Sequence, residues 1–62
     1  MNNKLLRPKD AAKKAGISIS HLYVLISKNE FPQLIKISER VSALLESEVD
    51  EWILEKVESS RK

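Results

Sequence analysis

The chain has 62 residues, a net charge of +2, 32% charged residues and no cysteine. This length suffices for one small domain with a modest core and leaves no room for a second domain that carries an active site. Without cysteine, neither a disulfide framework nor a cysteine-based zinc site stabilises the fold, and the composition fits a reducing, cytoplasmic setting. No apolar run reaches transmembrane length, so we expect no contact with a membrane.

Charge is unevenly distributed along the chain. Residues 1–40 carry eight basic and three acidic side chains, a balance of +5, whereas residues 41–62 carry three basic and six acidic side chains, a balance of −3. A basic front and an acidic back are typical of a protein that presents one side to a polyanion. Chance can produce a similar imbalance in so highly charged a chain, so this feature alone favours a polyanionic partner only slightly.

The first predicted helix begins at Pro8 and ends before Gly16. Proline suits the first turn of a helix, where its missing N–H costs nothing. The apolar residues of this helix are small and share one face, which allows a second helix to approach closely; they are Ala11, Ala12 and Ala15. Gly16, the only glycine, can adopt the left-handed conformation that ends a helix and turns the chain.

A second helix is predicted over residues 19–28, directly after the turn. Ser18 is placed to cap it by accepting a hydrogen bond from a free N–H of its first turn. Its predicted buried stripe is Leu22, Leu25, Ile26 and Asn29, and its outer face carries small, polar or basic residues, namely Ser20, His21, Val24, Ser27 and Lys28. Two helices joined by a tight glycine turn, the second with a small polar outer face, are typical of a helix-turn-helix that reads DNA, although any αα-hairpin with a glycine turn shows a similar pattern.

A two-stranded hairpin is predicted to follow as a wing. Pro32 prevents the second helix from continuing, and Phe31 is expected to be a buried anchor between helix and strand. Residues 34–37 and 41–45 are short runs with β-branched content, joined by a polar link at 38–40. Because Ile35 and Ile37 alternate with Lys36, we expect Lys36 to face away from the packed side.

The last predicted helix opens at residues 46–50. Ser47 is the candidate cap, with Asp50 as an approximate capping-box partner. The predicted buried stripe contains the only tryptophan, the largest apolar contribution in the chain; it consists of Val49, Trp52, Ile53 and Val57. We therefore expect a mainly α fold with a small β-hairpin, a winged helix-turn-helix, over residues 5–58, with Leu5 and Leu6 as an extended lead-in and with flexible tails at 1–4 and 59–62.

Enzyme chemistry is poorly supported. His21 is the only histidine, and a lone histidine on an exposed helix face is more often a contact residue than a general base or a metal ligand. The six carboxylates of the C-terminal half match a solvated helix face, and no glycine-rich phosphate loop is present. We expect no catalytic residues, no metal, no cofactor and no small-molecule substrate.

One residue pattern covers most of the chain, from about Leu5 to Ile53. It reads L-L-R-x-x-x-A-A-x-x-x-G-I-S-x-S-x-L-Y-x-L-I, then F-P-x-x-I-K-I, then R-V, then E-S-E-V-x-x-W-I. This order resembles the AlpA-like regulators of phages and prophages, which belong with the excisionase and MerR-type winged helices. The resemblance implies binding at phage or prophage control sites, with a role in transcription or in directing integrase toward excision. Relatives often carry basic residues where this chain has Ile19 and Val24, which places the affinity or the target sequence in question.

The first hypothesis is therefore a small sequence-specific DNA-binding regulator whose second helix enters the major groove of double-stranded DNA. Base edges would be approached by Ser20, His21, Val24 and Ser27, and phosphates would be held by Ser18, Tyr23 and Lys28. The Tyr23 ring flanks the buried stripe, so a purely structural role is nearly as consistent. Lys36 and Arg40 of the wing would grip the backbone, while Lys9, Lys13 and Lys14 would add distant attraction.

One such module touches few base pairs, so copies of the protein on adjacent sites, or a partner such as an integrase, would be needed for useful specificity. The alternative hypothesis is a protein–protein interaction adaptor that uses the same fold. Its docking patch would be apolar and would draw on Val24, Leu34, Leu44 or Leu45. Binding to random duplex DNA that falls steeply with salt would favour the first hypothesis, and salt-insensitive dimerisation would favour the second.

Overall fold

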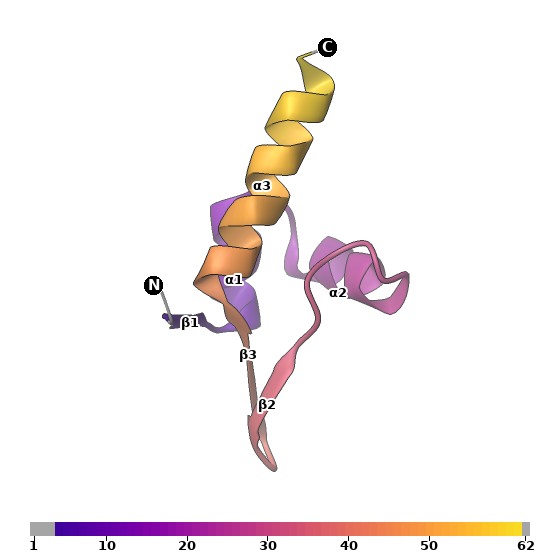
Figure 1. Cartoon of the computed structure of the whole chain (residues 1–62). Helices are drawn as coiled ribbons and strands as arrows, with labels where there is room; N and C mark the ends of the chain where they lie inside the picture. Colours follow the sequence, from indigo (N-terminus) through magenta and orange to yellow (C-terminus); the bar gives the residue numbers. More distant parts are fainter. Residues whose placement is uncertain (1–3, 62) are drawn as a thin grey trace.

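The computed structural model of the chain describes residues 4–61 and has the winged helix-turn-helix architecture that the sequence predicts. Three helices pack around a small core, and a two-stranded wing projects from one end (Figure 1). In chain order the elements are β1 (Leu5–Leu6), α1 (Pro8–Ala15), α2 (Ile19–Ser27), β2 (Ile35–Ser38), β3 (Val41–Leu45) and α3 (Glu46–Ser60). The extended lead-in expected at Leu5 and Leu6 is confirmed as β1.

The turn between α1 and α2 forms as expected. Gly16 has a φ of 75°, and the N–H groups of Gly16 and Ile17 donate to the carbonyl oxygens of Lys13 and Ala12 at 3.2 and 3.0 Å. Two left-over carbonyls of α1 are thereby satisfied while the chain reverses. Ala11 and Ala12 are buried, so small side chains do allow α1 to pack closely on the core.

Helix α2 is capped at its start, and Asn29, shortly after its end, has a left-handed backbone conformation. The Ser18 hydroxyl oxygen accepts a hydrogen bond from the backbone N–H of His21 at 3.0 Å, which confirms the predicted cap. Leu22 is fully buried, as expected. Asn29 was wrongly predicted to extend the buried stripe, because α2 ends at Ser27 and Asn29 is exposed with a φ of 59°. The N–H of Glu30 then donates to the Leu25 carbonyl at 2.8 Å and closes the helix.

The core is small and draws on most elements of the fold. Its buried residues are Ala11, Ala12, Leu22, Phe31, Leu44 and Val49. Phe31 is confirmed as a buried anchor, with 4% of its surface exposed. Trp52 packs at the edge of this core and is half-buried. Its ring lies 4.7 Å from that of Phe31, and its indole Nε1–H donates to the carbonyl oxygen of Glu30 at 2.8 Å.

The sheet has the strand order β1-β3-β2, and both pairings are antiparallel. Leu6 pairs with Leu44 at the base of the sheet, while β2 and β3 form the wing, with an irregularity in register between Lys36 and Ser38. All four residues of β2 are exposed. The expectation that one side of β2 packs is therefore wrong, because this edge strand extends past the helices and pairs with β3 (Figure 1).

Helix α3 begins two residues earlier than a cap at Ser47 requires. It follows β3 without a loop, and the N–H of Glu46 donates to the carbonyl oxygen of Lys4 at 2.8 Å. Ser47 therefore lies inside the first turn, and the predicted capping box of Ser47 and Asp50 is wrong. Asp50 instead forms an ion pair with Lys14 at 2.8 Å.

Lys14 connects α1 to α3. Its Nζ lies 2.8 Å from Asp50 and 3.2 Å from Glu46, and these hydrogen bonds, to Asp50 first, raise the pKa of the Lys14 ammonium. The two pairs are largely exposed, so they orient the helices more than they stabilise them. They also neutralise Lys14, which we had expected to act with Lys9 and Lys13 as a distant attractor.

The end of α3 extends beyond the body of the molecule. Val57, expected in the buried stripe, is 38% exposed because the core ends near Ile53. The helix continues to Ser60, which overlaps the tail expected at 59–62. Most of the other expected tail, residues 1–3, and Lys62 lie outside the described residues.

Candidate nucleic-acid interface

The outer face of α2 is open to solvent. Ser20, His21, Val24, Ser27 and Lys28 are all exposed, opposite the fully buried Leu22. Val24, at 47% exposure, lies on the side that the predicted helix phase requires. No other described element covers this face of α2. The helix can therefore approach a large ligand such as a DNA duplex.

Hydrogen bonds within α2 limit what its hydroxyl groups can offer. The Ser27 hydroxyl donates to the carbonyl oxygen of Val24 at 2.7 Å, so its proton is engaged and its oxygen stays available as an acceptor. The Ser18 oxygen already accepts the capping bond, and its proton stays available as a donor. Each serine therefore presents one function outward, an acceptor at Ser27 and a donor at Ser18.

Apolar surface borders this polar face. Tyr23 is 48% exposed and Ile19 is 41% exposed, so both present part of their side chains beside Val24. At this exposure the Tyr23 ring is not fully packed on the core, and its contact with a phosphate stays a prediction. The reading face is consequently a mixture of methyl groups, an aromatic edge and hydroxyls, with Lys28 as its only full positive charge.

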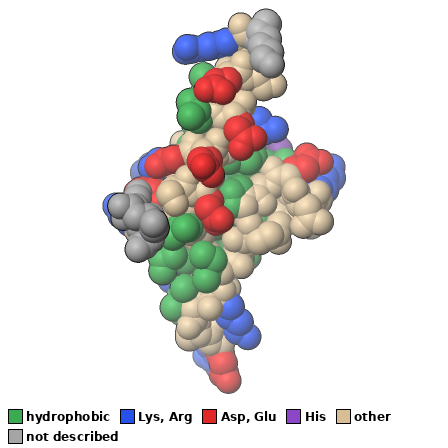
Figure 2. All heavy atoms as spheres, in the orientation of Figure 1, with side chains coloured by type: hydrophobic (Ala, Val, Ile, Leu, Met, Phe, Trp, Pro, Cys, Tyr) green, Lys and Arg blue, Asp and Glu red, His purple; other side chains and the backbone are tan. Residues whose placement is uncertain are grey.

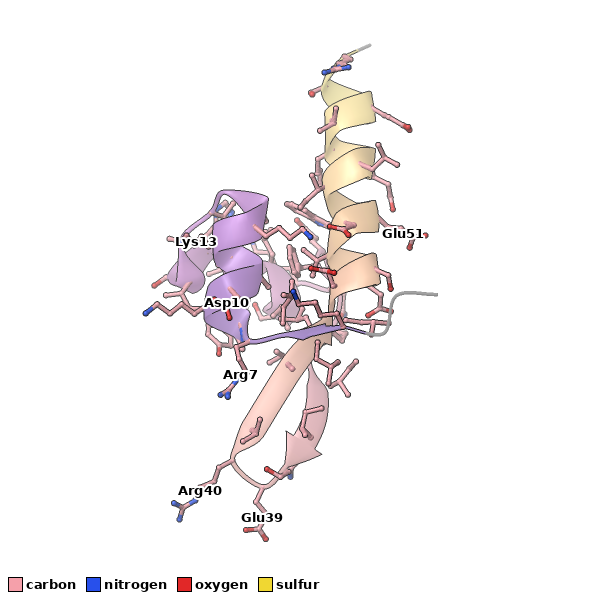
Figure 3. All side chains as sticks on the ribbon, turned by 90° about the vertical axis from the view of Figure 1, so that its left-hand side faces the viewer. Arg7, Asp10, Lys13, Glu39, Arg40 and Glu51 are labelled. Carbon is pink, nitrogen blue, oxygen red and sulfur yellow. The ribbon has the colours of Figure 1, made fainter. Side chains whose placement is uncertain are left out.

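The wing places two cations in solvent. Lys36 lies on β2, and Arg40 occupies the turn between β2 and β3. Among residues 4–61, neither side chain has a hydrogen-bond or ion-pair partner. Figure 3 shows Arg40 at the tip of the wing beside Glu39, pointing away from the body.

Arg7 is a further exposed cation that sequence reasoning did not select. It precedes α1 in an extended conformation, and Figure 3 shows it on the same side of the body as Lys13 and Arg40. The local signal was present, because a residue before proline is restricted to extended backbone. The backbone of Arg7 is therefore extended at the start of α1, and its side chain is exposed there.

Basic and acidic side chains are mixed on the side that carries Arg7, Lys13 and Arg40, because Figure 3 shows Asp10 and Glu39 on that side as well. Glu51 points away from the side that carries Arg7, Lys13 and Arg40 (Figure 3). Acidic side chains gather over α3 on the face seen in Figure 2. Acidic side chains are thus most concentrated over α3, which leaves the side of Arg7, Lys13 and Arg40 the more favourable one for a polyanion (Figure 2, Figure 3).

Residues 4–61 contain no group of three or more histidine, cysteine or acidic side chains arranged to hold a metal ion. No helix within the same residues has the length and apolar character needed to cross a membrane.

The apolar docking patch considered as an alternative does not form. Leu44 is fully buried in the core, and Leu34 and Leu45 are only partly exposed. Leu44 pairs with Leu6 in the sheet and faces the helices, so a partner has no access to it. Of the patch residues, only Val24 lies in the open, and it belongs to the face of α2 described above.

A helix-turn-helix with a wing and an open second helix defines a winged helix-turn-helix fold. The sequence model of the family described as Prophage CP4-57 regulatory protein (AlpA) matches residues 4–57, most of the chain. The protein belongs to this AlpA family of prophage regulatory proteins, as the residue pattern from Leu5 to Ile53 indicates. No curated protein and no solved structure matches the chain.

Proposed function

We propose that the protein is a cytoplasmic, sequence-specific DNA-binding regulator that inserts α2 into the major groove. The observation that carries this proposal is the two-sidedness of α2, in which Leu22 is fully buried while the whole opposite face is open. A capped second helix held this way presents its side chains rigidly to a groove. Membership in a family of prophage regulatory proteins supports the same conclusion.

Base reading falls to Ser20, His21, Val24 and Ser27. The commonest specific contact to guanine uses an arginine or lysine in bidentate geometry, and the centre of this face has neither. The exposed methyl groups of Val24 instead suit the C5-methyl of thymine, and the Ser27 oxygen suits an amino donor on a base edge. We therefore propose a site in which thymine methyls face α2.

Phosphate contacts fall to side chains around this face and on the wing. Ser18, Tyr23 and Lys28 border α2, and Lys36 and Arg40 extend the contact along the duplex. Arg7 and Lys13 add attraction from the same side as Arg40. Such contacts set orientation and affinity without selecting sequence.

Two roles are compatible with this interface, transcriptional regulation and an excisionase-like role beside an integrase. A module with one reading helix covers few base pairs, so adjacent copies of the protein or a second protein supply the remaining specificity. We place transcriptional or excisive control at prophage sites within this proposal because the family is regulatory.

The test is a selection of bound duplexes from a random library, followed by salt titrations on the selected site and a scrambled duplex. We expect tighter binding to the selected site and a steep fall of affinity with salt on both. Replacing thymine by uracil at each position of the selected site removes single methyl groups. The position that faces Val24 should lose affinity in the wild type and lose none in Val24→Ala. Absence of any salt-dependent binding to duplex DNA would overturn the proposal.

A second variant tests the phase of α2. Val24→Arg places a cation on the open face, where the side chain meets groove or solvent. We expect tighter binding to random duplex and a salt slope steeper by about one unit, with an unchanged thermal midpoint. A lowered thermal midpoint for Val24→Arg would show that position 24 does not face solvent.

A further inference from the structure

A groove lies between α3 and the loop that follows α2. It has a volume of about 490 Å³ and is bordered by residues 29–32 on one side and by α3 on the other. Its floor is aromatic, formed by Phe31 and Trp52. Its rim carries four carboxylates, those of Glu30, Glu48, Glu51 and Glu55.

The groove is held in shape by the protein itself. The indole N–H of Trp52 donates to the Glu30 carbonyl at 2.8 Å, and the Phe31 ring packs against the indole at 4.7 Å. These contacts join the loop to α3, so the two walls stay at a fixed separation. A ligand therefore meets a preformed surface and loses little free energy in ordering it.

One cation already occupies part of this groove. Lys56 is the only basic residue among the lining side chains, and its Nζ lies 5.5 Å from the centroid of the Trp52 ring. The chain thus places a positive charge over the indole face from within. An incoming guanidinium would suit this position better than an ammonium, because it stacks on aromatic rings and pairs with carboxylates through two hydrogen bonds.

The α3 wall of the groove faces away from the cations of α1 and of the wing (Figure 3), whereas its other wall begins directly after Lys28. Glu51, on its rim, points to the opposite side from Arg7, Lys13 and Arg40 (Figure 3). Acidic side chains also dominate the α3 face in Figure 2. Nucleic acid is repelled from such a rim, and the rim stays accessible when the basic side is engaged.

We propose that this groove binds an arginine-bearing basic segment of a partner protein. An arginine stacks on Trp52 and displaces Lys56, and the surrounding carboxylates pair with it and with neighbouring basic residues. The protein would thereby hold DNA on one side and a second protein on the other.

The single tryptophan makes the groove directly observable. The probes are short synthetic peptides in which arginine, lysine or glutamate alternates with leucine, added to the full chain without DNA. We expect a saturable change of Trp52 emission with the arginine peptide, a weaker affinity for the lysine peptide and no change with the glutamate peptide. No response to the arginine peptide would overturn the proposal, whether or not the protein binds DNA.

Matched variants separate the groove from general acidity. Glu51→Lys should lower the affinity for the arginine peptide by at least about tenfold, since it places a positive charge on the rim that repels the peptide. Glu58→Lys makes the same charge change on the same helix but outside the groove. It should lower the affinity for the arginine peptide by less than about twofold, because an exposed charge is screened by salt. Lys56→Met removes the resident cation and should strengthen binding by about threefold. Equal losses in the two lysine variants would overturn the proposal, because net charge alone would then account for binding.

Two further outcomes decide what the occupant is. A change of Trp52 emission with protein concentration alone, abolished by Glu51→Lys, would show that a second copy of the chain fills the groove and would overturn a foreign partner. Retention of peptide binding on a protein saturated with duplex DNA supports simultaneous contact. Loss of peptide binding on DNA would overturn it.

Discussion

The body and the wing of this molecule are held together by different forces. In the body, Leu22 and Val49 are fully buried, and Leu44 at the base of β3 joins them in the core. In the wing, every residue of β2 is exposed, and the strand is held by its ladder with β3 alone. The isoleucines of β2, Ile35 and Ile37, remain in solvent although their type suits a core.

This difference indicates where stability and where binding reside. A side chain of the body contributes by leaving water, at roughly 25 cal/mol per Å² of apolar area. The exposed side chains of β2 contribute less in this way, so their positions serve contact with something outside the chain. Substitutions should therefore separate into those that lower stability and those that change only binding.

The largest effect is expected from Leu22→Ala. Leu22 is fully buried between α2 and the core, and such truncations cost about 2–5 kcal/mol in the free energy of unfolding. That cost is comparable with the whole stability of a domain this small. The matched control is Ile37→Ala in the wing, which is 49% exposed and should shift the denaturation midpoint only slightly. Similar losses in the two variants would erase the distinction between body and wing.

A smaller effect is expected at the start of α2. Ser18→Ala removes the hydroxyl that caps the His21 N–H and should cost about 1 kcal/mol, or roughly 4–8 °C in thermal midpoint. Ser47→Ala is the control, since Ser47 lies inside α3 and makes no capping bond. A midpoint that falls as far in Ser47→Ala as in Ser18→Ala would contradict the assignment of Glu46 as the first residue of α3.

Arg40→Ala tests the wing as a binding element. The side chain has no partner among residues 4–61, so its loss should leave the thermal midpoint unchanged. Binding to specific and scrambled duplexes should weaken by similar factors, with a salt slope lower by about one unit. An unchanged affinity on both duplexes would show that the wing does not touch DNA, whereas a loss confined to the specific duplex would show that it reads sequence.

The smallest effect is expected from Ser27→Ala. The Ser27 hydroxyl donates to the Val24 carbonyl, so only its oxygen is left to meet a base edge. The salt slope should stay near the wild-type value, and discrimination between sites should fall by about 1 kcal/mol, the low end for base readout. If Ser27→Ala leaves the discrimination between sites unchanged while Val24→Ala reduces it, then methyl contacts and not the Ser27 hydroxyl account for base reading by this part of α2.

Much of the fold followed from local chemistry. Gly16, Ser18 and Pro8 mark turn, cap and helix start through the conformations and hydrogen bonds of single residues, and the structure agrees at all three. The body could be predicted for the same reason, since Phe31 and the stripe from Leu22 follow simple spacing. The outward phase of α2 was likewise readable, because it is the complement of a buried stripe.

The errors arose where a distant segment replaced a local partner. Ser47 is a good cap by its position in sequence, yet Lys4, far away in the chain, supplies the carbonyl that receives the Glu46 N–H. Val57 and Ile37 have the spacing of buried residues, but they remain 38% and 49% exposed. Periodicity shows which face of an element is apolar, and only the fold decides whether anything covers it.

The same limit applies to the candidate interface. The sequence named the exposed positions of α2 and the wing, but not Arg7 or the neutralisation of Lys14 by Asp50 and Glu46. Which cations remain free depends on the ion pairs that the folded chain makes. The contacts of the proposed site residues with DNA stay predictions for the experiments above.

Helix α3 gives the molecule a visible polarity. Ile53 is its last residue packed on the core, and the helix continues to Ser60, so its end stands about 10 Å beyond the body at 1.5 Å per residue. Figure 1 shows this end and the wing tip at opposite extremes of a molecule 42 Å long. Because the chain has no cysteine, Ser59→Cys would carry a single dye far from the proposed contacts. Energy transfer from that dye to either end of a short duplex would reveal which way the protein points along an asymmetric site.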